Sequence, residues 1–176
     1  MRLRPRLLIP ALVAGLALPV AVASPASAQS AFATRIGGQV LLTALPGKAN
    51  DIGLLGIGPA GAIDLLIADF NDAVIAGPGC TQFLTAARCG RISSISRLTV
   101  RLGDQNDEYF HDPIATFPAT VDPGPGNDEV LTGPRADTVT ARDGAVDQIG
   151  CGAGFDVVTA DVADVVAADC ELVRRS

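Results

Sequence analysis

An aspartate followed two residues later by an apolar residue recurs about every nine residues between Val121 and Cys170. The spacings between successive aspartates are 9, 10, 9 and 8 residues, and Val or Ile stands at each apolar position. The five aspartates are Asp128, Asp137, Asp147, Asp156 and Asp164. A turn followed by a very short strand, repeated at a nearly fixed period, predicts a solenoid, in which each repeat buries its apolar side chain against its neighbours.

The repeated unit resembles the calcium-binding nonapeptide of the hemolysin-type (RTX) proteins, with the consensus G-G-x-G-x-D-x-U-x, where U is apolar. The first copy, DPGPGNDEVL, places Gly124 and Gly126 at glycine positions and Asp128 at the aspartate position. The fourth copy, CGAGFDVVTA, restores the same three positions with Gly152, Gly154 and Asp156. The resemblance covers roughly residues 98–171.

The other copies are degenerate. Arg135 replaces a glycine before Asp137, and Asp143 stands at a glycine position before Asp147. An upstream relative, LGDQNDEYF, places Asp107 in register with the later aspartates.

This resemblance implies an all-β fold in which residues 98–176 form a right-handed parallel β-roll or β-helix solenoid. It also implies Ca²⁺ as the cofactor, because in the family each ion is held by aspartates and glycine-loop carbonyls of successive turns. The candidate ligands are Asp107, Gly124, Gly126, Asp128, Asp137, Asp143, Asp147, Gly152, Gly154 and Asp156.

Two nonapeptides make one coil of a β-roll, so residues about 18 apart should stack at the strand spacing of roughly 4.8 Å. One ladder is expected from four aspartates separated by 21, 19 and 17 residues, namely Asp107, Asp128, Asp147 and Asp164. A second ladder is expected from Asp137 and Asp156. Stacked carboxylates repel each other by about 1 kcal/mol per pair in water, and a cation between them reverses the sign.

The first ladder is expected to bind calcium better than the second, because Asp143 adds a carboxylate beside Asp147. On the second ladder, Arg135 is expected to pair with Asp137 or Asp156 and neutralise it without an ion. An ion-free interpretation stays open for both, since an aspartate after Gly or Asn is a good turn residue in its own right.

The first 28 residues have the pattern of a secretory signal peptide. MRLRPR is a basic segment, an apolar run broken by prolines follows, and Ala26-Ser27-Ala28 gives a small-residue cleavage site. A membrane anchor is the alternative, but the apolar run is short and contains prolines. We therefore expect a secreted, extracellular protein with no membrane span after cleavage.

Removal of residues 1–28 leaves ten basic and 19 acidic residues, a net charge of −9. Sixteen of the acidic residues are Asp, which favours turns over helices. So acidic a chain, with no basic patch, is a poor nucleic-acid binder and should attract cations.

Four cysteines in an exported chain predict two disulfides, for which the sequence allows three connectivities. Pairing between neighbours, Cys80 with Cys89 and Cys151 with Cys170, is favoured because it closes short loops. The alternative of a zinc site lacks C-x-x-C pairs.

Residues 29–97 are predicted to form an irregular β-rich N-terminal portion that covers the open end of the solenoid. Strands are expected at residues 36–45, 52–57, 62–68 and 73–76, and a half-buried strand at residues 95–102. Asp64, Asp69 and Asp72 are expected to be solvated turn residues.

Candidates for catalysis are few. His111 is the one histidine and is expected in a solvated loop beside Asp112. We therefore predict a protein that is not an enzyme: a secreted calcium-binding β-solenoid in which calcium stabilises the repeats. The alternative is an ion-independent, disulfide-stabilised cell-surface or adhesive module with an extracellular partner that the sequence does not identify.

Overall fold

The computed structural model describes residues 29–176, which are strands and turns with one short 3-10 helix, Ile92–Ser94. The predicted all-β class is confirmed, and the predicted signal peptide lies outside the described residues. Among residues 29–176, no helix has the length and apolar character needed to cross a membrane. The strands form two eight-stranded sheets, here called sheet A and sheet B.

In both sheets, the C-terminal strands lie at one end and the N-terminal strands at the other. Sheet A consists, in spatial order, of β16 (Leu172–Arg175), β14 (Val157–Ala160), β12 (Thr138–Ala141), β10 (Ala119–Asp122), β8 (Arg97–Arg101), β2 (Gln39–Ala44), β1 (Gln29–Ile36) and β5 (Ala73–Ala76). Sheet B consists of β15 (Val165–Val166), β13 (Gln148–Gly150), β11 (Glu129–Leu131), β9 (Glu108–His111), β3 (Asp51–Ile57), β4 (Asp64–Asp69), β7 (Ala86–Arg91) and β6 (Thr81–Phe83).

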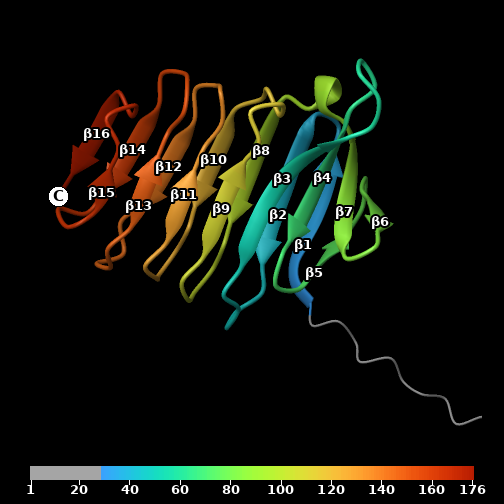
Figure 1. The fold of residues 1–176 in the computed structure, drawn as a ribbon. Helices are drawn as coiled ribbons and strands as arrows, with labels where there is room; N and C mark the ends of the chain where they lie inside the picture. Colours follow the sequence, from blue (N-terminus) through green and yellow to red (C-terminus); the bar gives the residue numbers. More distant parts are fainter. Residues whose placement is uncertain (1–28) are drawn as a thin grey trace, which may run out of the picture.

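From β8 onward the chain alternates between the sheets, and from β10 onward each strand pairs in parallel with the strand two before it. Val139 thus pairs with Val121 on one side and with Val158 on the other. Two short strands and two turns carry the chain from one layer to the next, and Figure 1 shows the layers following one another to the C-terminal end at β15 and β16.

The N-terminal strands continue both sheets. β2 pairs in parallel with β8, and β3 pairs in parallel with β9. In sheet A, β1 then pairs antiparallel with β2, and β5 pairs in parallel with β1 at the edge. In sheet B, β4, β7 and β6 follow β3 as antiparallel neighbours. Of the predicted strands, residues 73–76 match β5 at both ends, whereas residues 36–45 contain the end of β1, a tight turn and β2.

The core lies between the two sheets, because alternate side chains of each strand point inward. The apolar residues that follow the repeat aspartates are at most 3% exposed at Val130, Val139, Ile149 and Val158. Val166 is half-buried because β15 is the edge strand of sheet B. Leu98, Val100 and Leu102 are fully buried, as their alternation predicted.

His111 belongs to this core, so its prediction as a solvated loop residue is wrong. It lies in β9 and is 2% exposed. Its Nε2 is 2.7 Å from the carbonyl oxygen of Ala115, and its Nδ1 is 3.3 Å from the hydroxyl of Tyr109. Burial lowers the pKa of His111, which favours the neutral ring as a hydrogen-bonding core residue.

Both predicted disulfides are present. Cys80 is bonded to Cys89, and Cys151 is bonded to Cys170. Two disulfides are compatible with an extracellular protein, because such bonds persist in oxidising compartments.

The prediction that Asp64 and Asp69 are solvated is also wrong, since they are 6% and 5% exposed. Asp64 is paired with the guanidinium groups of Arg88 and Arg91. Asp69 accepts a hydrogen bond of 2.8 Å from Nδ2 of Asn50. Both aspartates therefore connect segments of the N-terminal portion through partners distant in sequence.

Candidate metal centre

The predicted first ladder is present as a chain of hydrogen bonds along one edge of the molecule. In each layer, Oδ1 of the aspartate accepts a hydrogen bond from the backbone N–H of the equivalent residue in the preceding layer. The donors and acceptors are Asp107 N–H to Asp128 at 2.8 Å, Asp128 N–H to Asp147 at 2.9 Å, and Asp147 N–H to Asp164 at 3.1 Å. We call this chain of carboxylates the first ladder.

The ladder aspartates are buried, not spread along a solvated edge. Asp107, Asp128 and Asp147 are 1%, 2% and 0% exposed. Oδ2 of each of these three side chains is buried without a hydrogen-bond partner. A buried carboxylate oxygen without a donor costs free energy, so each of these atoms calls for a bound proton, a water molecule or a cation.

Asp143 joins two of these carboxylates in a compact cluster. One ligand atom each from Asp128, Asp143 and Asp147 lies within 4.8 Å of the other two. Oxygens bound to one calcium ion at about 2.4 Å can be up to roughly 4.8 Å apart, so the cluster has the size that a metal ion requires. All three residues were among the predicted ligands.

Asp143 is itself fixed by the backbone. Its Oδ2 accepts a hydrogen bond of 2.9 Å from the N–H of Gly126, and its Oδ1 accepts one of 2.8 Å from the N–H of Ala145. Each carboxylate oxygen has a second lone pair, so these bonds orient Asp143 without using up its capacity to bind a cation.

The charges of the first ladder are not balanced by basic side chains. Within residues 29–176, the ion pairs shorter than 4.0 Å join Lys48 to Asp72, and Arg88 and Arg91 to Asp64, all in the N-terminal strands. Burial raises the pKa of Asp107 to about 7, and burial with repulsion from neighbouring carboxylates raises the pKa of Asp128 and of Asp147 to about 6.

A hollow of about 230 Å³ gives access to this edge. It lies over Asp107 and Asp128, and its walls include Asn106 and Asn127. These two asparagines lie beside the ladder but bond in the reverse direction, because Oδ1 of Asn106, in the earlier layer, accepts a hydrogen bond of 3.0 Å from the N–H of Asn127 in the later one. The lining is predominantly polar, which suits an ion or water better than an apolar ligand.

The predicted second ladder is also present, on the opposite edge. The N–H of Ala119 donates to Oδ1 of Asp137 at 2.6 Å, and the N–H of Asp137 donates to Oδ1 of Asp156 at 2.7 Å. Oδ2 of Asp137 has its own donor, the N–H of Gly133 at 3.0 Å, whereas Oδ2 of Asp156 is without a partner. Burial raises the pKa of both carboxyls.

The prediction that Arg135 pairs with Asp137 or Asp156 is wrong. Its Nε donates to the carbonyl oxygen of Thr116 at 3.3 Å, and within the described chain no ion pair joins it to either aspartate. Both carboxylates lie inside the stack, held by backbone N–H groups, while Arg135 is exposed.

The predicted turn glycines allow the layers to approach closely. Gly124 has φ of +82°, and a Cβ built there would overlap the carbonyl oxygen of Gly103. A Cβ on Gly126 would likewise overlap the carbonyl oxygen of Gln105. Gly152 and Gly154 lie over the carbonyls of Gly133 and Arg135, at 2.7 and 2.6 Å from a built Cβ. These positions therefore require glycine whether or not their carbonyls bind an ion.

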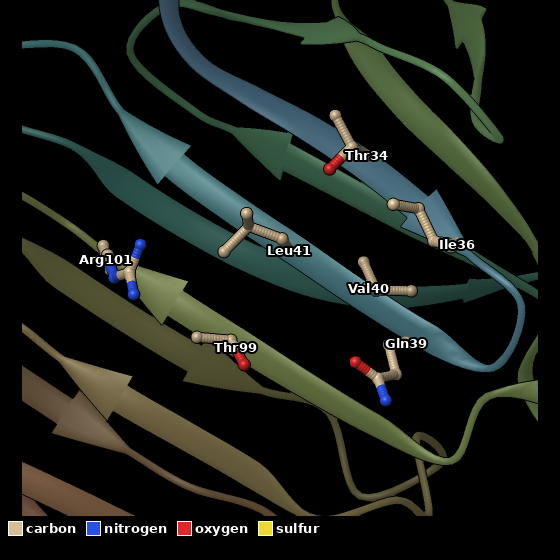
Figure 2. A pocket seen from close by; sticks show the side chains of 7 residues that line it. All are labelled: Thr34, Ile36, Gln39, Val40, Leu41, Thr99 and Arg101. Atoms are coloured by element: carbon tan, nitrogen blue, oxygen red, sulfur yellow. The ribbon is translucent and has the colours of Figure 1, made fainter.

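A second hollow, of about 290 Å³, lies on the outer face of sheet A. Figure 2 shows its side chains spread along β1, β2 and β8, with Arg101 as the charged group among Thr, Gln, Val, Leu and Ile side chains. This lining brings together no pair of carboxylates and no nucleophile with a base.

Asn50 is a ladder residue that the sequence analysis missed. Its N–H donates to Oδ1 of Asp107 at 2.7 Å, so it stands one layer before Asp107. It is 2% exposed, and its Oδ1 is buried without a partner. The signal in the sequence was the turn PGKAN followed by the apolar strand, which lacks the aspartate that marks the later layers.

Comparison with known proteins returned no match: neither a protein-family model, nor a curated protein, nor a solved structure is significantly similar to this chain. The functional argument therefore depends on the residues of this chain.

Proposed function

We propose that this chain is a secreted calcium-binding β-solenoid of the hemolysin-type (RTX) repeat kind, in which calcium stabilises the repeats. The layers from β8 to β16 would form the β-roll, and residues 29–97 its N-terminal cap. The function is structural binding of an ion, not catalysis.

One observation carries the proposal. Oδ2 of Asp128 and Oδ2 of Asp147 are buried without partners, in the cluster that includes Asp143. A cation held by these oxygens would neutralise repulsion between carboxylates that the fold keeps within 4.8 Å of one another. The free energy of ion binding would then add to the stability of the folded state.

The chemistry of the cluster supports calcium over other common metals. Its side-chain donors are carboxylate oxygens, whereas zinc sites are built mainly from Cys and His. Calcium accepts six to eight oxygens with flexible geometry, and water or turn carbonyls could complete its shell. Magnesium demands a smaller and more regular octahedron. Extracellular calcium modules bind in the range of about 10⁻⁴ to 10⁻³ M.

A titration of thermal stability tests this function. Protein freed of metal with a chelator is melted at increasing calcium concentrations, with magnesium as the comparison ion. We expect the midpoint Tm to rise with calcium and to saturate, and magnesium to have a smaller effect. No change of Tm at millimolar calcium would rule out the proposed function.

The alternative, an ion-independent surface module, has its own observation. Oδ1 of every aspartate in both ladders already bonds to the backbone of the preceding layer, so the carboxylates hold the layers together without any ion. In that case water or a proton would satisfy the Oδ2 atoms. The same titration separates the two functions.

A further inference from the structure

The loop contacts around the Asp128, Asp143 and Asp147 cluster occur a second time, at the junction between the N-terminal strands and the repeats. In the cluster, the N–H of Gly126 donates to Asp143 and the N–H of Asp128 donates to Asp147. The upper layer thus gives two backbone donors to two aspartates of the layer below. Asp143 precedes its ladder aspartate by four residues.

At the junction, the turn between β2 and β3 is the upper layer and the turn between β8 and β9 is the lower one. The N–H of Gly47 donates to Oδ1 of Asp104 at 2.5 Å, and the N–H of Asn50 donates to Oδ1 of Asp107 at 2.7 Å. Asp104 precedes Asp107 by three residues. Asn50, Asp104 and Asp107 therefore take the places of Asp128, Asp143 and Asp147.

The two places also share unpartnered acceptors. Oδ1 of Asn50 and Oδ2 of Asp107 are both buried without a hydrogen bond, just as Oδ2 of Asp128 and Oδ2 of Asp147 are. Nδ2 of Asn50 donates to Asp69 at 2.8 Å, which fixes the amide so that its oxygen is the free atom. An amide oxygen is a good calcium ligand, as carboxylates are.

The turn between β10 and β11, which precedes Asp128, differs from the turns that carry Asp104 and Asp143. In the turn before Asp128, the residues DPGPGN carry glycine and proline where Asp104 and Asp143 stand in the other layers. The ladder step from Asp107 to Asp128 therefore lacks the outer carboxylate. At the next step, from Asp147 to Asp164, Asp161 is in place, but Oδ2 of Asp164 already accepts the N–H of Asp161 at 2.6 Å.

From this repetition we propose a second calcium site at the junction, formed by Oδ1 of Asn50 with the carboxylates of Asp104 and Asp107. The site rests on the proposed function, because it applies the same ion to a different layer. It carries one negative charge fewer than the cluster in the repeats, so it is the weaker of the two. Its ion ties the turn after β2 to the turn after β8, and so joins the N-terminal strands to the repeats.

Calcium binding to the whole secreted protein, measured by calorimetry and by terbium luminescence, tests the junction site. The parent protein should bind two ions with different affinities. Asp104→Asn keeps an oxygen for the N–H of Gly47 but removes a charge, so the weaker site should lose about tenfold or more in affinity.

Asp112→Asn is the matched control. It removes one charge from the turn after β9, where Oδ1 of Asp112 accepts the N–H of Ile114, outside both proposed sites, and it should leave both affinities unchanged. Asp143→Asn should weaken the stronger site alone. One bound ion that responds to Asp143→Asn but not to Asp104→Asn would overturn the junction site and leave the proposed function standing. No bound ion in the parent would remove both.

Discussion

The two ladders use the same residue in the same hydrogen bond, yet they leave different atoms free. On the second ladder, both oxygens of Asp137 have backbone donors, from Ala119 and Gly133, and only Oδ2 of Asp156 is buried without one. On the first ladder, Asp107, Asp128 and Asp147 each keep one buried oxygen without a donor. The comparison teaches that a repeated aspartate does not define a metal site. Unsatisfied acceptors on neighbouring layers do, and in the described chain the first ladder has them, whereas the neighbour of Asp156 on the second ladder, Asp137, is satisfied.

The largest expected effect comes from Asp147→Ala compared with Asp137→Ala. Each change removes a buried side-chain hydrogen bond and should lower the free energy of unfolding by about 1 to 3 kcal/mol. Asp147→Ala should also abolish the gain from calcium bound at the Asp128, Asp143 and Asp147 cluster, which is about 2.7 kcal/mol at a concentration 100 times the Kd of that site. Thermal melts with calcium and with chelator measure both quantities. Equal loss of the calcium gain in the two variants would contradict the distinction between the ladders.

Removal of the disulfide between Cys151 and Cys170 should have the next largest effect. These residues are 19 apart, and closing a loop of that size stabilises a fold by roughly 3 kcal/mol. Because the bond lies near the end of the second ladder, the variant Cys151→Ser with Cys170→Ser should lose the same stability with calcium as with chelator. A larger loss in calcium would show that the disulfide supports the first ladder instead.

A pH dependence should follow from the first ladder when calcium is absent. The pKa of Asp107 is raised to about 7, and those of Asp128 and Asp147 to about 6, so the folded state holds protons at pH values where the unfolded state has released them. The contribution of the first ladder to stability is therefore fully present below about pH 4 and is lost as the pH rises to about 7. Each tenfold change in proton affinity corresponds to about 1.4 kcal/mol, so we expect a loss of about 2 kcal/mol or more.

Melting the protein in chelator from acid to neutral pH measures this loss. Calcium should remove the decline near neutral pH, since the ion replaces the protons on the same oxygens. Asp107→Asn should reduce the pH dependence, and Asp137→Asn should reduce it as well, because burial also raises the pKa of Asp137. A Tm that rises steadily from pH 4 to pH 7 in chelator would contradict the assigned burial of these carboxyls.

The smallest expected effect is that of Arg135→Ala. Its guanidinium donates to one exposed carbonyl and pairs with neither aspartate of the second ladder, so the free energy of unfolding should change by less than about 0.5 kcal/mol. The calcium response should be unchanged. A large loss of stability, measured by denaturant unfolding, would restore the predicted pairing with Asp137 or Asp156.

The sequence predicted the features that depend on spacing. The intervals between the aspartates gave both ladders, and the apolar residues two positions later gave the core of the repeat layers. The cluster of Asp128, Asp143 and Asp147 was among the predicted ligands for the same reason. These features require only that residues about one coil apart stack on one another.

The features that depend on a single distant donor were not predictable. Whether Oδ2 of Asp137 has a hydrogen-bond donor depends on the direction of the N–H of Gly133. The identity of the residues does not predict the direction of a backbone N–H. Asp64 was taken as solvated because its partners Arg88 and Arg91 come from another strand of sheet B. His111 could have been placed better, since it alternates with the apolar Tyr109 in a strand.

Every ladder bond points in one direction along the chain: the carboxylate of a later layer accepts from the N–H of the layer before it. A buried N–H without an acceptor is costly, so a layer is not complete until its successor has arrived. A chain that folds from its N-terminus thus leaves one N–H of each new layer without its acceptor until the next layer packs against it. The layers nearest the C-terminus therefore complete the hydrogen bonding of the layers before them.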